Sequence, residues 1–330
     1  MPHGYRIPRD TVGWPWQRVV VPSPSRLSWI ALSVVYVLWG STYLANRFIL
    51  ASVPPLLVGA LRFLVGGALL AVIVLAVGGR AAFRMTRAQF ATTALSGLLL
   101  PAWGNGLVVV AQQAVSSGLA ALLIAAVPLW IVLLRAVTGD RPRMATVGGV
   151  AVGVVGLGVL VLAGPASGGV HGAAWWGPWV VLLASLGWAT GTFATTRLPV
   201  PSNPFALAAV QMFTGGAILL VAGTAAGERL DFAAVTTASW VAWAYMAVVV
   251  SLGAFSAYAY ALANLPVSTV ATYAYVNPVI AVALGVLVAG ERFTGVQLFG
   301  GAIVLVAVVL VVAAERPSRK RRGVVATSTA

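Results

Sequence analysis

The sequence contains no cysteine and few charged residues. Without cysteine, disulfides, thiolate catalysis and thiolate metal sites are excluded. Only 8% of the 330 residues are charged, whereas soluble domains carry about a quarter. The hydrophobic share is 60%, and several uncharged stretches are long enough to cross a hydrocarbon core of about 30 Å as a helix. These features predict an all-α integral membrane protein.

Acidic residues and histidines are also scarce, at 6 and 2 respectively. No carboxylate lies inside an expected membrane span, and His3 and His171 lie in a tail and a loop. Proton antiport therefore has no obvious carrier. Glu291 is a poor second choice, because at a helix junction it is better explained as a cap or as a partner of Arg292 in solvated surface. The same scarcity argues against an enzyme, and we expect no catalytic residue, metal or cofactor.

The formal net charge of +14 and the pI near 11.5 do not indicate nucleic-acid binding. The basic residues lie mainly in the two tails and in short loops, with no basic face on a folded domain, so they are better explained by orientation in a membrane. We expect no nucleic-acid partner. The expected partners are the lipid bilayer and a small-molecule substrate, and the oligomeric state is left open.

Glycine, proline and charged clusters divide the apolar sequence into ten expected helices. Their ranges are 29–49, 55–77, 88–112, 116–137, 144–163, 173–196, 203–226, 238–263, 266–289 and 293–314. In the fifth helix, Gly149 and Gly153 have the spacing that lets membrane helices approach closely.

The basic residues alternate between the two sides of this ten-helix arrangement, as the positive-inside rule requires. One side carries Arg6, Arg9, Arg18, Arg26, Arg80, Arg84, Arg87, Arg135, Arg141, Arg143, Arg197, Arg316, Arg319, Lys320, Arg321 and Arg322, and the other carries only Arg47, Arg229 and Arg292. We therefore expect a multi-pass protein of the plasma (inner) membrane with both termini cytoplasmic. Residues 1–28 are then a cytoplasmic tail rather than a signal peptide, and 315–330 are a basic cytoplasmic tail.

The chain contains an internal repeat with an offset of 149 to 152 residues. Trp39 matches Trp188, Pro128 matches Pro278, and Ala60 to Ala68 match Ala209 to Ala217. The repeats are 29–163 and 173–314, each with five helices. Because five is odd, the second repeat enters the membrane from the opposite side. Such inverted repeats are typical of transporters that open a central site alternately to the two faces.

Arg62 is the one ionisable residue well inside an expected span. Charge is costly there, so the residue is a functional candidate that could attract a carboxylate or another anionic group of a substrate. The structural alternative is that Arg62 snorkels or caps the carbonyls of a broken helix.

Aromatic and amide residues fill the place that charges leave in the spans. Rings offer stacking and amides fix orientation in a cavity, although any single one is also explained by packing. Tyr273 and Trp103 also lie in spans, and the candidate substrate-binding set is Trp39, Tyr43, Arg62, Asn105, Trp130, Trp188, Gln211, Tyr258, Tyr275 and Asn277.

Several short motifs resemble one family. They are Trp39-Gly40-Ser41-Thr42-Tyr43, Leu61-Arg62-Phe63, Gly104-Asn105-Gly106, Ser117 to Ala121, Val127 to Trp130, Pro201 to Pro204, and Ala274 to Pro278 with Gly290-Glu291. Together they resemble the EamA family of the drug/metabolite transporter superfamily, in its YedA-like branch, over residues 28–314. The resemblance implies ten helices in two inverted five-helix repeats around a central cavity, and export of small metabolites. Four-helix members of the superfamily use a membrane glutamate for drug/proton antiport, and the first helix here has none.

The function expected from the sequence is secondary transport, with export of amino-acid-like or other small polar solutes by alternating access. One alternative is an exporter of lipophilic drugs or toxic cations, which the aromatic residues suit but Arg62 does not. A non-transporting membrane scaffold or sensor is the second alternative. Substrate, direction and coupling ion are not determined by the sequence.

Overall fold

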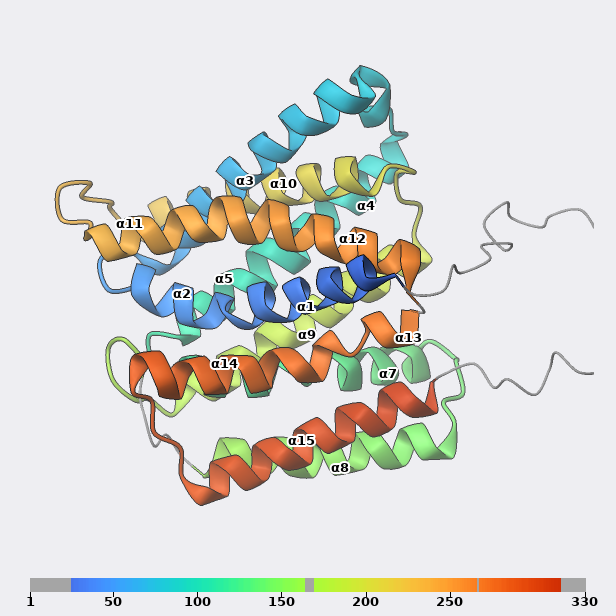
Figure 1. Ribbon diagram of the computed structural model, residues 1–330, viewed down its shortest axis with the longest axis vertical. Coiled ribbons are helices and arrows are strands. Elements are labelled where there is room, and N and C mark those ends of the chain that lie inside the picture. Colours follow the sequence, from blue (N-terminus) through green and yellow to red (C-terminus); the bar gives the residue numbers. More distant parts are fainter. Residues whose placement is uncertain (1–24, 164–168, 266, 316–330) are drawn as a thin grey trace, which may run out of the picture.

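The computed structural model describes residues 25–163, 169–265 and 267–315, and these form a bundle of helices running back and forth between two faces (Figure 1). We call the face that carries both ends of the described chain the terminal face, at the right of Figure 1, and the other the opposite face. The tails 1–24 and 316–330 lie outside the described residues.

Ten spans are present, as the sequence predicts, and their ends differ from the expected ones by at most three residues. In chain order they are α1 (Arg26–Gly40) with α2 (Thr42–Ile49); α3 (Pro55–Gly78); α4 (Arg87–Gly97), η3 (Leu98–Asn105) and α5 (Gly106–Ala111); α6 (Ser117–Ile124) with α7 (Val127–Val137); α8 (Met144–Leu162); α9 (Trp176–Arg197); α10 (Pro204–Ala225); α11 (Thr237–Ala244), η4 (Tyr245–Ala254) and α12 (Phe255–Asn264); α13 (Val267–Val270) with α14 (Tyr273–Ala289); and α15 (Gly295–Ala314). A short 3-10 turn, η2 (Arg80–Phe83), follows α3. Within the described residues, nine spans are long and apolar enough to cross a membrane by themselves, and α14 is a shorter apolar helix.

Local sequence signals set the helix ends. Proline occupies the first turn of α3 and of α10, where its missing N–H has no partner to lose. Thr86 and Thr294 begin α4 and α15 with capping boxes completed by Gln89 and Gln297.

Irregular helix geometry recurs at equivalent places in the two repeats. The third and eighth spans both contain a π-helical segment, η3 and η4. The fourth and ninth spans are both interrupted, between α6 and α7 and between α13 and α14. Because the halves have five spans each, these equivalent features run in opposite directions across the membrane, which is the inverted repeat that the sequence predicts.

Two close helix pairs join the halves: α3 with α10, and α8 with α15 (Figure 1). At the first crossing, Gly67 lies against the backbone at Ala209, and its repeat equivalent Gly216 lies against the backbone at Leu64. In the second pair, Gly149 faces Val311 and Gly153 faces Ala307 and Leu129, so the predicted close approach of these glycines is confirmed.

We predict that Gly216→Ala lowers the free energy of unfolding by about 1–3 kcal/mol, because the added Cβ overpacks the crossing. An ideal Cβ at Gly216 would lie 2.8 Å from the backbone nitrogen of Leu64. The matched control is Gly148→Ala on α8, where a Cβ meets no atom within 4 Å. Thermal unfolding of the purified protein in detergent provides the measurement, and equal melting temperatures for the two variants would contradict the tight crossing.

Candidate substrate site

Arg62 lies on the face of α3 that packs on the π-helical segment η4. Its neighbours one turn away on the same face are Val58 and Gly66. Val58 is fully buried in a cluster with Met246 and Val250 of that segment. A Cβ at Gly66 would meet Met212 of α10 and Ser251 of the same segment. Arg62 is therefore bracketed by contacts between α3 and η4.

The guanidinium of Arg62 has no acidic partner within the part of the chain that the structure describes. Its Cζ lies 4.9 Å from the centroid of the Phe63 ring, a cation-π contact. Its Nε is buried and has no hydrogen-bond partner among the described residues. A buried donor without a partner costs free energy, and an acceptor on a bound molecule would remove this cost.

The equivalent residue in the second repeat, Gln211, is hydrogen-bonded to another helix. Its Nε2 donates to the hydroxyl of Ser96 at 2.7 Å, which ties α10 to α4. The same position thus carries a hydrogen-bonded amide in one half and an unpaired cation in the other. The backbone fold is repeated in the two halves, but only the first half carries a charged residue at this position.

Two candidate aromatic residues, Trp39 and Tyr258, meet Tyr273 where the first, eighth and ninth spans come together. The ring centroid of Trp39 lies 5.1 Å from that of Tyr258 and 5.0 Å from that of Tyr273. Tyr258 and Tyr273 contact each other edge to face at 5.8 Å. The three residues, which we call the aromatic cluster, come from both repeats. Trp39 also packs against the core that contains Val58, so the cluster and α3 share a core.

A polar contact missed by the sequence reasoning stands beside this cluster. The first span is interrupted at Ser41, whose hydroxyl donates to the carbonyl of Leu38 at 2.9 Å and accepts the hydroxyl of Tyr245 at 2.6 Å. Tyr245 begins η4. A serine directly after Gly40 in an apolar helix is the one local signal of this break, and nothing local indicates its partner 204 positions away.

Asn277 and Tyr43 lie near the same break. Asn277 is 9% exposed, and its Oδ1 has no hydrogen-bond partner in the described structure. Its backbone carbonyl lies against Gly40, 3.2 Å from where a Cβ would stand. The backbone carbonyl of Tyr43 accepts the side-chain amide of Gln112 at 2.7 Å. Asn277 therefore offers a second unsatisfied buried group, this time an acceptor.

The structure places the other four candidates in separate contacts. Trp130 donates to Ser185 at 2.9 Å, and Asn105 donates to the carbonyl of Leu100 at 3.4 Å. Trp188 is 37% exposed and lies against Gly104, while Tyr275 lines an apolar groove with residues of α15.

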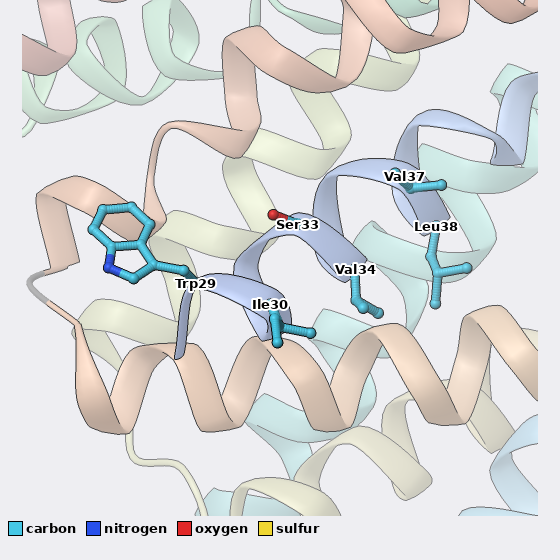
Figure 2. A pocket seen from close by; sticks show the side chains of 6 residues that line it. All are labelled: Trp29, Ile30, Ser33, Val34, Val37 and Leu38. Atoms are coloured by element: carbon cyan, nitrogen blue, oxygen red, sulfur yellow. The ribbon is translucent and has the colours of Figure 1, made fainter. Parts of the chain in front are cut away.

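The two described grooves are apolar and open at the bundle surface. The larger, of about 440 Å³, is lined by Trp29, Ile30, Ser33, Val34, Val37 and Leu38, all on α1 (Figure 2). The second, of about 330 Å³, lies between α14 and α15. Neither carries a charged group, so both suit hydrocarbon chains better than a polar solute.

The expectation that Glu291 lies in solvated surface is wrong. Glu291 is 4% exposed. Its carboxylate accepts Arg47 at 2.9 Å and the backbone N–H groups of Ser117 at 2.8 Å and Gly118 at 3.0 Å. The expectation of a helix cap is confirmed, but the capped helix is α6 in the other repeat. The sequence position of Glu291, in a charged junction, does not reveal this distant partner.

Ten apolar spans in two inverted repeats, with paired helix breaks and an unpaired intramembrane arginine, define a multi-pass membrane transporter of the repeat type. The model of the EamA-like transporter family matches the chain twice, at residues 27–162 and 175–313. The chain belongs to this family, and it acts on a small-molecule substrate as an EamA-type transporter.

Similar proteins include two named transporters. The chain is 36% identical to the uncharacterized inner membrane transporter YedA of Escherichia coli over 282 residues, covering 85% of this chain and 89% of YedA. It is 31% identical to a probable terminal-alkyne amino-acid exporter of Streptantibioticus cattleyicolor over 198 residues, covering 60% of this chain and 64% of that protein. A solved crystal structure matches with a TM-score of 0.60 at 22% identity, covering 89% of this chain and 100% of that chain, which shows a shared fold.

We predict that Trp39→Leu lowers the free energy of unfolding by about 1–3 kcal/mol, because two aromatic contacts worth about 0.5–1.5 kcal/mol each are lost. Trp29→Leu on the same helix is the control, since Trp29 is 49% exposed on the groove in Figure 2. Thermal unfolding in detergent compares the two. A larger effect at Trp29 would show that the aromatic cluster does not hold the halves together.

Proposed function

We propose that this transporter exports amino-acid-like or other small polar organic solutes by alternating access, and that Arg62 binds the carboxylate of the substrate. The observation that carries the proposal is the unpaired guanidinium of Arg62 within α3. A guanidinium matches a carboxylate with two parallel hydrogen bonds. Such a ligand supplies the partner that the described chain does not provide.

We assign the remaining groups of a zwitterion site to the junction of the first, eighth and ninth spans. The aromatic cluster offers ring faces to a cation, and the unpaired Oδ1 of Asn277 offers an acceptor to an ammonium group. We place the binding contacts at Arg62, Trp39, Tyr258 and Asn277. The remaining candidates are proposed to line the path of the substrate through the protein: Tyr43, Asn105, Trp130, Trp188, Gln211 and Tyr275.

Alternating access is supported by the paired breaks in the fourth and ninth spans. Two halves related by an in-plane pseudo-twofold can exchange conformations, and a helix interruption supplies a place for the exchange to bend. The direction of transport is proposed from the named activity of the Streptantibioticus cattleyicolor relative, a probable amino-acid exporter.

The proposed orientation has the terminal face in the cytoplasm of the cell, so that both termini are cytoplasmic. The described basic residues support this orientation. The terminal face carries Arg26, Arg80, Arg84, Arg87, Arg135, Arg141, Arg143 and Arg197, whereas the opposite face carries Arg47, Arg229 and Arg292.

Export of lipophilic cations is the competing function, and the aromatic cluster is the observation that favours it. An unpaired arginine that contributes to the same proposed site repels a cation, so we rank this function second. A comparison of amino-acid efflux with the drug-resistance profile of an overexpressing strain separates the two functions.

We predict that Arg62→Ala weakens transport of a carboxylate-bearing solute roughly ten- to hundredfold, the usual cost of losing a charge-assisted bond. Arg62→Lys should retain part of the transport, because it keeps the charge but not the two-bond geometry. Efflux of labelled amino acids, first identified by a metabolite screen of cells with and without the protein, is the measurement.

A matched control uses the best substrate and its amide, in which the carboxylate is replaced by an uncharged carboxamide. The protein with Arg62 should prefer the acid to its amide, and Arg62→Ala should lose that preference. Arg84→Ala, at an exposed position on the terminal face, should leave flux unchanged. Full efflux and an unchanged acid preference in Arg62→Ala would remove Arg62 from the site.

A further inference from the structure

Two ion pairs occupy equivalent places in the two repeats and lie on opposite faces of the membrane. Arg47, at the end of the first span, pairs with Glu291 at 2.9 Å. Arg197, at the end of the sixth span, pairs with Asp140 at 2.8 Å. The two arginines are 150 positions apart (197 − 47), and the two carboxylates are 151 apart (291 − 140), which is the repeat offset.

The backbone confirms the equivalence of the carboxylates. Asp140 follows Gly139 and Glu291 follows Gly290, and both glycines have positive φ, at 97° and 63°. Each glycine follows the second helix of an interrupted span, α7 or α14. Each ion pair joins the two halves, since its arginine and its carboxylate belong to different repeats.

The two pairs differ in how firmly they are held. The side chain of Glu291 is fully buried and accepts three donors from the first repeat, namely Arg47 and the N–H groups of Ser117 and Gly118. The side chain of Asp140 is 40% exposed, and in the described part of the chain its carboxylate is bound only by Arg197 and Arg135. Arg135 in turn also binds Glu315.

Comparison of the two repeats shows that, within the described residues, the Asp140–Arg197 pair lacks a helix cap. Ser117 and Gly118 begin α6, and their equivalents 150 positions later are Val267 and Ser268, which begin α13. At the opposite face the carboxylate caps the interrupted fourth span. No such cap from Asp140 to the interrupted ninth span is present among the described residues.

We propose that Glu291 and Asp140 are a pair of latches that close the two faces in alternation. In the conformation described, the Glu291 latch, formed with Arg47 and the start of α6, closes the opposite face. In the other conformation the Glu291 latch is released, and Asp140 with Arg197 caps the start of α13 and closes the terminal face. This inference rests on the proposed alternating access, and it assigns the residues that set the balance between the two states.

The latches alternate for a physical reason. Closing a latch removes its carboxylate from water, which costs free energy, and this cost is offset only when all the hydrogen-bond donors of the latch are in place. Opening a face exposes its carboxylate to water, which replaces the lost donors. The equilibrium between the states is then set by the difference between the latches, and neutralising one shifts the population towards the state that the other closes.

The absence of cysteine from the chain allows a direct test with one introduced thiol. Ser117→Cys is the reporter, because Ser117 is 1% exposed beside Glu291 and its hydroxyl makes no hydrogen bond within the described structure. The rate of labelling by a membrane-impermeant maleimide is measured in vesicles from each face, and labelling in detergent after denaturation counts the total thiols.

Glu291→Gln in this background is expected to raise the labelling rate about tenfold, within the usual range of coupling between conformational states. Adding Asp140→Asn should bring the rate back towards that of the reporter alone, because the other latch is also weakened. Local unfolding caused by Glu291→Gln would not be reversed by a substitution on the other face. A rate that stays high in the double variant overturns the proposal, as does an unchanged rate in the single one.

Glu228→Gln is the matched control. Glu228 also caps a helix across the two halves at the opposite face, accepting the N–H groups of Leu56 and Leu57 at 3.1 and 3.0 Å. Its repeat equivalent is not acidic, since the matching stretch is Gly78-Gly79-Arg80. Its substitution should leave the labelling of Ser117→Cys unchanged, and a rise equal to that of Glu291→Gln overturns the specific role of Glu291.

The labelling experiment needs no substrate, so its failure is distinguishable from failure of the proposed function. Absence of amino-acid efflux by the unmodified protein rejects the proposed substrate class while the latch still shows in labelling. Efflux that persists together with unchanged labelling in Glu291→Gln rejects the latch and leaves the substrate class standing.

Discussion

The architecture depends on one constraint, which is that hydrocarbon provides no hydrogen-bond partner for a backbone N–H or C=O group. Regular helices meet this requirement internally, but interrupted spans do not. Ser41 and Tyr245 serve the break in the first span, and the carboxylates of Glu291 and Glu228 serve the starts of α6 and α3. Tyr245, Glu291 and Glu228 come from the other repeat. The places where these polar contacts serve helix breaks and helix starts are therefore among the places where the halves are joined.

The same constraint explains why the fold was readable from the sequence. Spans must be long and apolar, their ends must carry glycine, proline or charge, and a repeat with five spans must invert. These are local or periodic properties, and the expected ends agree with the structure within three residues. The glycines at the α8 and α15 contact were likewise predictable, since small residues at helical spacing mark close crossings.

The contacts of individual polar residues were much less predictable. Glu291 stands in a charged junction that looks solvated in sequence, yet its carboxylate is bound by residues 173, 174 and 244 positions away. Tyr245 and the π-helical segments leave no distinctive local pattern. For Arg62 the sequence indicated an exceptional residue, because charge is costly in a span. It did not indicate that the Nε of this arginine has no partner in the described chain.

The two repeats also differ at particular positions. The glycine pairs, the breaks in the fourth and ninth spans and the ion pairs occur twice. The proposed exchange between two states accounts for this repetition, because it needs one set of contacts for each face. Arg62 and Gln211 occupy one repeat position but differ in charge and in partners, as expected if Arg62 binds the substrate as proposed, because a substrate binds in one orientation and needs only one cation. The described spans contain no carboxylate, and Glu291 and Asp140 lie at the helix ends. The proposed latches therefore place the control of the two states at the two faces, apart from the proposed binding site at Arg62.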